Sequence, residues 1–278
     1  MGYRNRPLDK RAIARRKAQG FGEGRGHRYK PWHIVQQTAS RGLSCRLHGW
    51  TDDRVVHLLS KLERNIFRIF DWTLGITEVR EQKDLPLEET LQIAQKHGIA
   101  HPRDPVTGEP TPLSTDFVIE VARAGEPTLH ARAVKYAADL ADPRVREKLD
   151  IERVYWERHG VRWAIITERD VPEALVHNIR WMRPWREMAG DGTLNETDVR
   201  MIGRYLERHL GTVDEPLRDV TNECDDLLGY PPGTALKVVR HFIATRQWEV
   251  DMRTRIDTGQ KLGVIRRAMV GSDARRIG

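Results

Sequence analysis

Residues 115–121 have the sequence TDFVIEV, and residues 130–136 have the sequence HARAVKY. Both stretches predict β-strands, because their side chains divide between two faces with a period of two residues. Asp116 lies at the start of the first predicted strand, and Lys135 lies near the end of the second. If the two strands are neighbours, these two side chains can meet at the rim of one sheet.

A predicted helix precedes these strands and adds a second carboxylate. Residues 52–72 repeat apolar side chains at helical spacing. Glu63 lies at the margin of the apolar stripe, so it faces either a cleft at the sheet rim or solvent beside Lys61. Together with Asp116 and Lys135 it makes a set of two carboxylates and one ammonium group. Such a set suits metal-dependent hydrolysis of a phosphodiester, which needs metal ligands and a cation for the developing charge.

The rest of this region predicts an α/β domain in which a mixed sheet is flanked by helices. A strand is expected at residues 76–82, a short helix within 84–99 and a longer helix at 144–159. Residues 161–167 (VRWAIIT) form a near-continuous apolar run. That run predicts a strand in the middle of a sheet covered on both faces.

The first 30 residues carry most of the excess positive charge. They contain ten Lys or Arg against Asp9 and Glu23, a net charge of +8, so the remaining residues sum to −1 because the whole chain is +7. A basic arm of this kind binds a polyanion without reading its sequence, and the alternative is a solvated disordered tail. The candidate DNA contacts in the arm are Lys10, Arg11, Arg15, Arg16 and Lys17.

Glycine alternates with other residues at the end of this arm, at Gly20, Gly22, Gly24 and Gly26. The context of a dinucleotide or Walker loop is missing, because no predicted strand precedes these glycines and no helical pattern follows. We therefore expect a flexible hinge between a basic arm (residues 1–30) and a folded domain (residues 31–184).

A second domain is predicted at residues 185–260. Its expected elements are helices at 195–209, 215–228 and 234–246 and short strands at 248–252 and 254–257. Three helices followed by a two-stranded wing describe a winged helix-turn-helix. Its third helix carries Lys237 and Arg240, which can enter a DNA groove, although binding of a partner protein is the favoured alternative. A basic tail follows at residues 261–278.

Composition narrows the class of protein. No apolar run approaches the roughly 20 residues that span a bilayer, so we expect neither a membrane protein nor a membrane partner. Cys45 and Cys224 lie far apart in the sequence and offer neither a disulfide framework nor a zinc pair. A reducing cytoplasm is the simplest location.

Several blocks, in this order, resemble the TnsA endonucleases of heteromeric cut-and-paste transposons. They are PWHIVQQTASRG (31–42), LLSKLERNIF (58–67), VREQKDLPLEET (79–90), STDFVIEV (114–121), AVKYAADL (133–140) and EKLDIERVYWERHGVRWAIITE (147–168). The likeness implies a restriction-endonuclease-like fold, in which an Asp on one strand is followed by x-Val-Lys on the next.

The resemblance also implies roles for individual residues. The family's catalytic glutamate falls on Glu63, its aspartate on Asp116 and its lysine on Lys135, and the metal ligands would be the two carboxylates with the main-chain carbonyl of Val134. The family usually has glutamine where this chain has Ala133, which offers no side-chain ligand.

Glu152 matches a further family acid implicated in activity. From the residues alone, a salt bridge to Lys148 on a solvated helix face is an equal alternative, because the two lie four positions apart.

The activity implied by this family is metal-dependent cleavage of DNA. The resemblance implies Mg²⁺, with Mn²⁺ as a substitute and two ions in the site, and cleavage of the non-transferred strand at the 5′ ends of the element. The implied partners are transposon-end DNA, a DDE-type transposase subunit (TnsB-like) and an AAA ATPase regulator (TnsC-like) at the bacterial nucleoid. Two other functions stay open: a catalytically inactive DNA-binding adaptor, which Ala133 allows, and a stand-alone restriction or repair nuclease.

Overall fold

The computed structural model describes residues 9–36, 43–122, 125–187, 194–210 and 214–267. The chain divides into two compact units, residues 1–171 and residues 172–278. The division falls before the helix α5 (Glu173–Met182), whereas the sequence predicted that the first domain extends to residue 184. Among the helices of the described ranges, none combines the length and the hydropathy that a membrane crossing requires.

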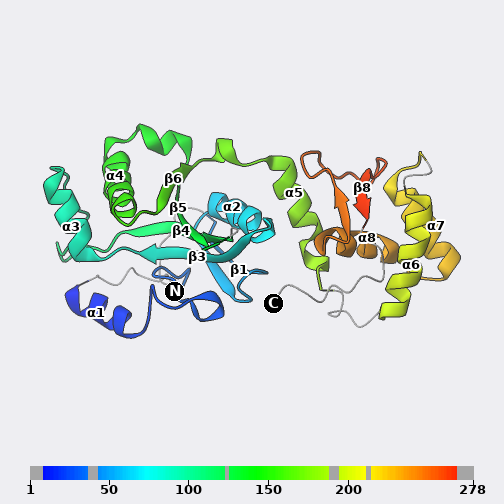
Figure 1. The fold of residues 1–278 in the computed structure, drawn as a ribbon, viewed down its shortest axis with the longest axis horizontal. Coiled ribbons are helices and arrows are strands. Elements are labelled where there is room, and N and C mark those ends of the chain that lie inside the picture. The colour runs from blue at the N-terminus through cyan, green and yellow to red at the C-terminus, as the bar shows by residue number, and fades with distance from the viewer. Residues whose placement is uncertain (1–8, 37–42, 123–124, 188–193, 211–213, 268–278) are drawn as a thin grey trace. The chain divides into compact units, whose positions relative to one another are not determined.

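A four-stranded mixed sheet forms the centre of the first unit (Figure 1). Its order is β3 (Ile76–Asp84), β4 (Ser114–Val121), β5 (Thr128–Val134) and β6 (Arg162–Ile166). β4 is antiparallel to both β3 and β5, and β6 is parallel to β5. The predicted strands are confirmed, but β6 is an edge strand and not a central one. The predicted central position was wrong because an apolar run does not distinguish a half-buried edge strand from a buried central strand.

Helices cover both faces of this sheet, and each face has its own apolar core. The helix α2 (Lys61–Trp72) contributes Leu62, Ile66 and Phe67 to the core that contains Phe117 and Ile119. On the opposite face, α3 (Leu87–Lys96) and α4 (Pro143–Arg158) pack over Val118 and Ala131. The predicted division of the 115–121 strand into two faces is therefore confirmed. Two short 3₁₀ helices, Ala137–Ala141 and Glu168–Asp170, complete the unit.

The predicted helix at 52–72 is wrong in its first half. Val55–Leu58 is a strand, β2, that pairs antiparallel with β1 (Cys45–His48). The apolar residues of β2 fit either period over so short a run, but Val55 and Val56 are β-branched and favour a strand. The helix begins only after Ser60, whose side chain accepts a hydrogen bond from the N–H of Glu63.

Residues 9–36, named here the N-terminal segment, are folded and not a flexible arm. They contain the helix α1 (Lys10–Ala18), capped by Asp9, and a 3₁₀ helix, Gly26–Arg28. Ile13, Phe21 and Trp32 form a small buried core. The expected flexible hinge is also wrong. Its four glycines all adopt left-handed backbone angles that glycine allows at no steric cost, and they form fixed turns.

The N-terminal segment lies against the edge strand β3. Three successive residues of β3 are hydrogen-bonded to it. Tyr29 Oη donates to the carbonyl of Glu81 (2.9 Å), Trp32 N donates to the carbonyl of Gln82 (3.0 Å), and Lys83 Nζ donates to the carbonyl of Gly22 (2.8 Å). The edge is thus covered by an irregular segment, one of the ways in which proteins protect an unpaired strand.

The second unit contains helices followed by a small sheet. Its elements are α5, a 3₁₀ helix (Arg183–Trp185), α6 (Glu196–His209), α7 (Leu217–Leu228), α8 (Thr234–Ala244), β7 (Trp248–Val250) and β8 (Val264–Arg267). The three helices α6 to α8 are where the sequence predicted them. The hairpin is not, because the partner of β7 is β8 and not residues 254–257. Asn178 explains this, since its side-chain amide binds backbone atoms of Met252, Thr254 and Ile256 and holds this stretch as a loop.

Candidate active site

Asp116 and Lys135 meet at the rim of the sheet, as the sequence predicted. Lys135 Nζ lies 2.8 Å from Asp116 Oδ2 and 2.9 Å from the carbonyl oxygen of Val134. The same Asp116 oxygen accepts a hydrogen bond from the N–H of Val134 (2.6 Å). β4 supplies the carboxylate, and the end of β5 supplies the other two groups.

Glu63 is the second carboxylate at this rim, and the start of α2 holds it there. It is 6% exposed, and its Oε2 accepts a hydrogen bond from the N–H of Leu59 (2.9 Å). Its own N–H donates to Ser60 Oγ (3.0 Å). Ser60-Lys61-Leu62-Glu63 is the sequence pattern of a capping box, which could have placed this helix start correctly. Glu63 faces inward and not toward solvent.

Gln82 joins the two carboxylates, and sequence reasoning did not find it. Its Nε2 lies 3.3 Å from Glu63 Oε2 and 3.3 Å from Asp116 Oδ1. Gln82 is 3% exposed and has a left-handed backbone, with φ of 49°. The alternation of the strand gives no signal for such a residue, because the local backbone departs from the regular strand.

Glu152 comes to the same region from α4. It is 6% exposed and accepts a hydrogen bond from Trp163 Nε1 (3.0 Å). It is therefore an interior carboxylate, and the alternative of a solvated salt bridge to Lys148 does not describe it.

Burial and neighbouring charge shift the pKa values of these groups. Burial, followed by the charge of Asp116, raises the pKa of Glu63 from 4.5 to about 7, and the same two causes raise the pKa of Glu152 to about 7. Burial acts to lower the pKa of Lys135, but the nearby carboxylates, Asp116 foremost, outweigh it and raise that pKa to about 12. Lys135 is thus a permanent cation among three acids at neutral pH.

The oxygen atoms at this rim fit a divalent cation. No three His, Cys, Asp or Glu side chains within the described ranges lie close enough together to hold an ion. The oxygens that could hold an ion are instead those of the Glu63 and Asp116 carboxylates and of the Val134 carbonyl, which are hard ligands of the kind that Mg²⁺ and Mn²⁺ prefer. Lys135 Nζ shows that one positive centre can reach both Asp116 and Val134. Ala133 is fully buried and adds no ligand.

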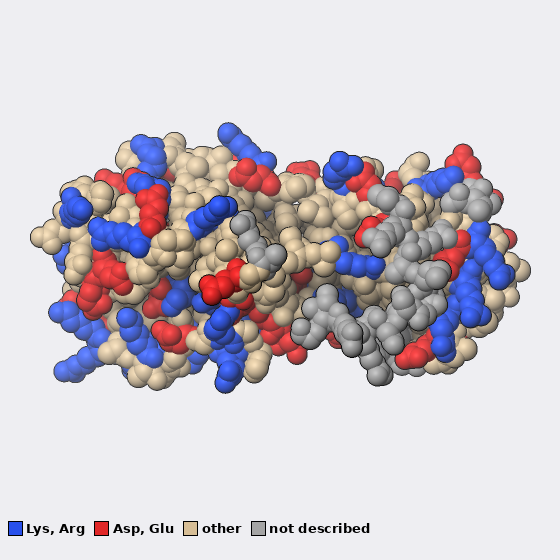
Figure 2. All heavy atoms as spheres, in the orientation of Figure 1, with Lys and Arg blue, Asp and Glu red and all other residues tan. Residues whose placement is uncertain are grey.

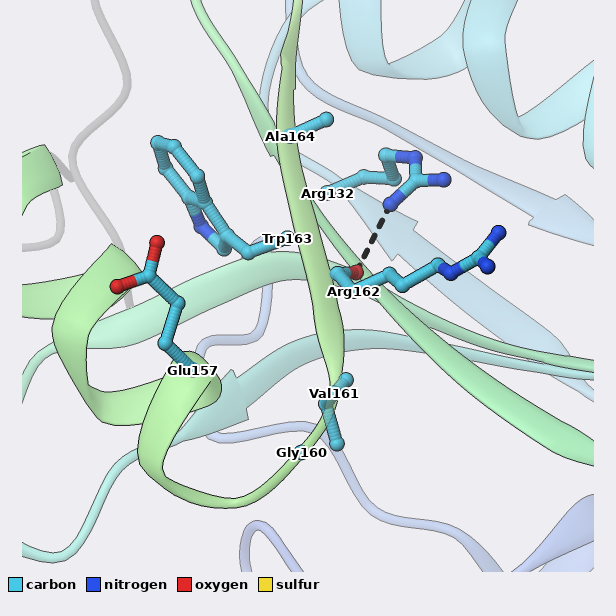
Figure 3. A pocket seen from close by; sticks show the side chains of 7 residues that line it. All are labelled: Arg132, Glu157, Gly160, Val161, Arg162, Trp163 and Ala164. Atoms are coloured by element: carbon cyan, nitrogen blue, oxygen red, sulfur yellow. Dashed lines mark hydrogen bonds between the residues drawn. The ribbon is translucent and has the colours of Figure 1, made fainter.

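An open hollow of about 550 Å³ lies at the start of the edge strand β6 (Figure 3). The side chains of Arg132 and Arg162 extend on one side of the strand, while Trp163 lies on the other. Arg132 Nη1 donates to the carbonyl of Arg162 (3.0 Å). Trp163 links the hollow to the carboxylate cluster through its hydrogen bond to Glu152.

Comparison with known proteins gives three matches. Residues 75–168 match the family model of the TnsA-like endonuclease N terminal, and residues 170–252 match that of the TnsA endonuclease C terminal. The chain is 37% identical over 182 residues to the transposon Tn7 transposition protein TnsA of Escherichia coli. The chain belongs to the TnsA endonuclease family. The aligned region spans 66% of this chain and 66% of that relative, slightly under two thirds of each.

The two TnsA family models meet where the structure divides. The N-terminal model ends at residue 168 and the C-terminal model begins at residue 170, close to the boundary between the two units at 171 and 172. The N-terminal model includes Asp116, Lys135 and Glu152 but starts after Glu63. Glu63 is placed in the site because its Oε2 lies 3.3 Å from Gln82 Nε2, and the N-terminal family model does not cover it.

The basic residues expected to bind DNA in the N-terminal segment of this TnsA family member have different environments. Lys10, Arg11, Arg15 and Lys17 are exposed on α1. Arg16 is half-buried, with its guanidinium carbon 4.3 Å from the ring centroid of Phe21 and 5.0 Å from that of Trp32. On the face shown in Figure 2, Lys and Arg side chains are interspersed with Asp and Glu.

Lys237 and Arg240, the candidate DNA contacts of the second unit, pack against tryptophans. Lys237 Nζ lies 5.2 Å from the ring centroid of Trp185. The Arg240 guanidinium carbon lies 4.5 Å from the ring centroid of Trp181 and 6.0 Å from that of Trp185. Burial lowers the pKa of Arg240, and its Nε is buried without a hydrogen-bond partner. Arg240 is therefore part of the packing of this unit.

Proposed function

We propose that this protein is the DNA endonuclease subunit of a heteromeric transposase. One observation carries the proposal: Glu63 and Asp116 share hydrogen bonds with Gln82, while Lys135 binds Asp116 and the Val134 carbonyl at the same rim. Two carboxylates, a carbonyl and a permanent cation are what phosphodiester hydrolysis needs. Membership of the TnsA endonuclease family supports this chemistry.

Each residue has a distinct part in the proposed reaction. Glu63, Asp116 and the Val134 carbonyl hold Mg²⁺ or Mn²⁺, with two ions in the complete site. A divalent cation held there supplies the Lewis-acid charge that polarises a phosphate oxygen. Lys135 stays protonated through the physiological range, since its pKa is about 12, so it offsets charge on the phosphate and does not act as a base. Glu152 supports the site from α4 through its effect on Lys135.

The substrate in this proposal is the non-transferred strand at the 5′ ends of a mobile element. The first unit then has a restriction-endonuclease-like fold and the second a winged-helix-like fold. Arg132 and Arg162, which line the hollow at the start of β6, offer guanidinium groups for DNA phosphates, and the exposed α1 residues Lys10 and Arg11 add non-specific attraction. The proposed protein partners are a DDE-type transposase subunit and an AAA ATPase.

A strand-specific nicking assay tests the proposal. Element-end DNA, labelled separately on each strand, is incubated with this protein, its transposase partner and Mg²⁺. We expect cleavage of the non-transferred strand alone, and its loss with Asp116→Asn. Cleavage that Asp116→Asn leaves unchanged would identify the protein as an inactive adaptor. Equal cleavage without the partner would identify a stand-alone nuclease.

A further inference from the structure

We propose that Gln82 is a positioning residue of the active site, whose side-chain amide sets the spacing of the two metal-binding carboxylates. The inference rests on the proposed function, because it concerns the ion that Glu63 and Asp116 would hold. It assigns to Gln82 a role that neither the strand pattern nor the basic motifs of the sequence suggested.

The side-chain amide of Gln82 bridges the carboxylates of Glu63 and Asp116. Asp116 comes from a strand and Glu63 from the start of a helix, so no secondary structure fixes the distance between them. Gln82 Nε2 lies 3.3 Å from one oxygen of each. A single NH₂ group has two donors, which is the number that two acceptors require. Gln82 thereby ties together two acids whose charges repel each other.

The carboxylates set the orientation of this amide. Ionised carboxylates only accept hydrogen bonds, so the donating nitrogen of Gln82 faces them and the oxygen points away. Gln82 Oε1 then accepts a hydrogen bond from Ser114 Oγ (3.2 Å). Ser114 therefore anchors the end of the amide that does not meet the carboxylates.

The backbone of Gln82 is held in an uncommon conformation that directs its side chain to the rim. Its φ of 49° lies in the left-handed region, which costs a non-glycine residue about 1–2 kcal/mol. The residues on either side of Gln82 keep their places in the β3–β4 pairing, with Glu81 opposite Phe117 and Lys83 opposite Thr115. The N–H of Trp32 binds the carbonyl of Gln82 and so supports this conformation from the N-terminal segment. Strain maintained by surrounding structure is a known property of functional sites.

Gln82→Asn separates the role of the side chain from that of the backbone. Asparagine adopts left-handed angles more readily than glutamine, so the backbone keeps its conformation. Its side chain is one methylene shorter and cannot span both carboxylates. Loss of a partner of metal ligands typically reduces metal affinity about 10-fold or more. We therefore expect the Mn²⁺ dissociation constant of the full-length protein to rise about 10-fold, with an unchanged or higher melting temperature.

Mn²⁺ binding is measured by the electron paramagnetic resonance signal of the free ion, without DNA or partner. Asp116→Asn establishes that the signal reports this site. Asp53→Asn is the matched control, since Asp53 is a second left-handed residue (φ of 47°) outside the site. It should leave Mn²⁺ binding unchanged, whereas Ser114→Ala, which removes the hydrogen-bond donor to the amide oxygen, should weaken it.

In the nicking assay, Gln82→Asn should raise the Mg²⁺ concentration for half-maximal rate. Two results would overturn the positioning role of Gln82. The Gln82→Asn variant could bind Mn²⁺ as tightly as the wild type, or its Mn²⁺ affinity and its melting temperature could fall together. Failure of the wild-type protein to bind Mn²⁺ would overturn the proposed function as well, so the two failures are distinguishable.

Discussion

Lys135 Nζ lies 2.8 Å from Asp116 Oδ2, an oxygen that also accepts the N–H of Val134. This carboxylate oxygen is therefore held by two donors from consecutive residues of one chain segment. The Lys135 side chain is about one third exposed, so the pair opens to the rim and is reachable by a substrate. A charged donor fixed in this way can act on a phosphate without reorganising first.

Lys135→Ala should reduce the rate of strand cleavage on the order of 100-fold or more, because it removes a preorganised cation from the transition state. The affinity for element-end DNA should change little, since basic residues outside the active site provide most of the attraction to the DNA phosphates. Single-turnover cleavage and a DNA-binding titration measure the two effects. Lys148→Ala, an exposed lysine on α4, is the control and should cleave normally. A rate loss below about threefold for Lys135→Ala would remove this residue from the catalytic set.

The raised pKa of Glu152 predicts a pH-dependent stability of the metal-free protein. Burial raises this pKa from 4.5 to about 7, so the folded state retains a proton that the unfolded state has released. The contribution of protonated Glu152 to the free energy of unfolding is fully present below pH 4.5, and it is lost as pH rises through 7. Glu152→Gln keeps the shape without the charge, and it should be more stable than wild type at pH 8 by up to about 3 kcal/mol.

Urea unfolding in the presence of a chelator, at pH 5, 6, 7 and 8, measures this difference. The gap between Glu152→Gln and wild type should widen with pH. Glu157→Gln, an exposed position on the same helix, controls for the loss of one negative charge at the surface. A gap that stays constant across this range would mean that Glu152 is charged throughout and that its burial is tolerated by other means.

The packing of Arg240 against Trp181 and Trp185 predicts a role in stability. Arg240→Ala removes the stacking with Trp181 and Trp185 and should destabilise the second unit by about 1–2 kcal/mol. The salt dependence of DNA binding should keep its slope, because each lost phosphate contact would lower it by about 0.9. Arg204→Ala, an exposed change on α6, is the control for stability. A reduced slope with normal stability would instead support the groove contact expected from the sequence.

Regular periodicity made part of this structure predictable. The strands β4 and β5 alternate clearly, so the sequence placed Asp116 and Lys135 together correctly. Helical periodicity predicts Glu63 on a helix, but it does not mark where the helix begins, which the capping pattern at Ser60 does. Gln82 could not have been found from periodicity, since its position depends on a left-handed angle within a strand. The N-terminal segment was misjudged because charge dominates its composition, while three scattered residues, Ile13, Phe21 and Trp32, supply its core.

Two glycines of the N-terminal segment predict how strongly that segment supports the active site. Gly22 and Gly20 have similar left-handed angles, with φ of 81° and 75°. A Cβ on Gly22 would lie 1.8 Å from Asp84 Oδ1, whereas a Cβ on Gly20 would meet no atom within 4 Å. Both alanine variants carry the left-handed penalty of about 1–2 kcal/mol. Only Gly22→Ala must also relieve a clash with the buried Asp84 carboxylate, either by turning that side chain or by moving the segment away from β3. Overpacking of this kind costs about 1–3 kcal/mol more.

Gly22→Ala should therefore melt below Gly20→Ala and bind Mn²⁺ more weakly. The displaced segment loses the bond between Lys83 and Gly22 and loosens the nearby bond from Trp32 to Gln82, which supports the site. Thermal unfolding, the Mn²⁺ titration and hydrogen exchange at the Trp32 amide measure the three consequences. If Gly22→Ala loses stability but keeps wild-type Mn²⁺ affinity and Trp32 protection, the segment only covers the edge of β3. If all three change together while Gly20→Ala changes stability alone, the N-terminal segment supports the metal site through Gln82.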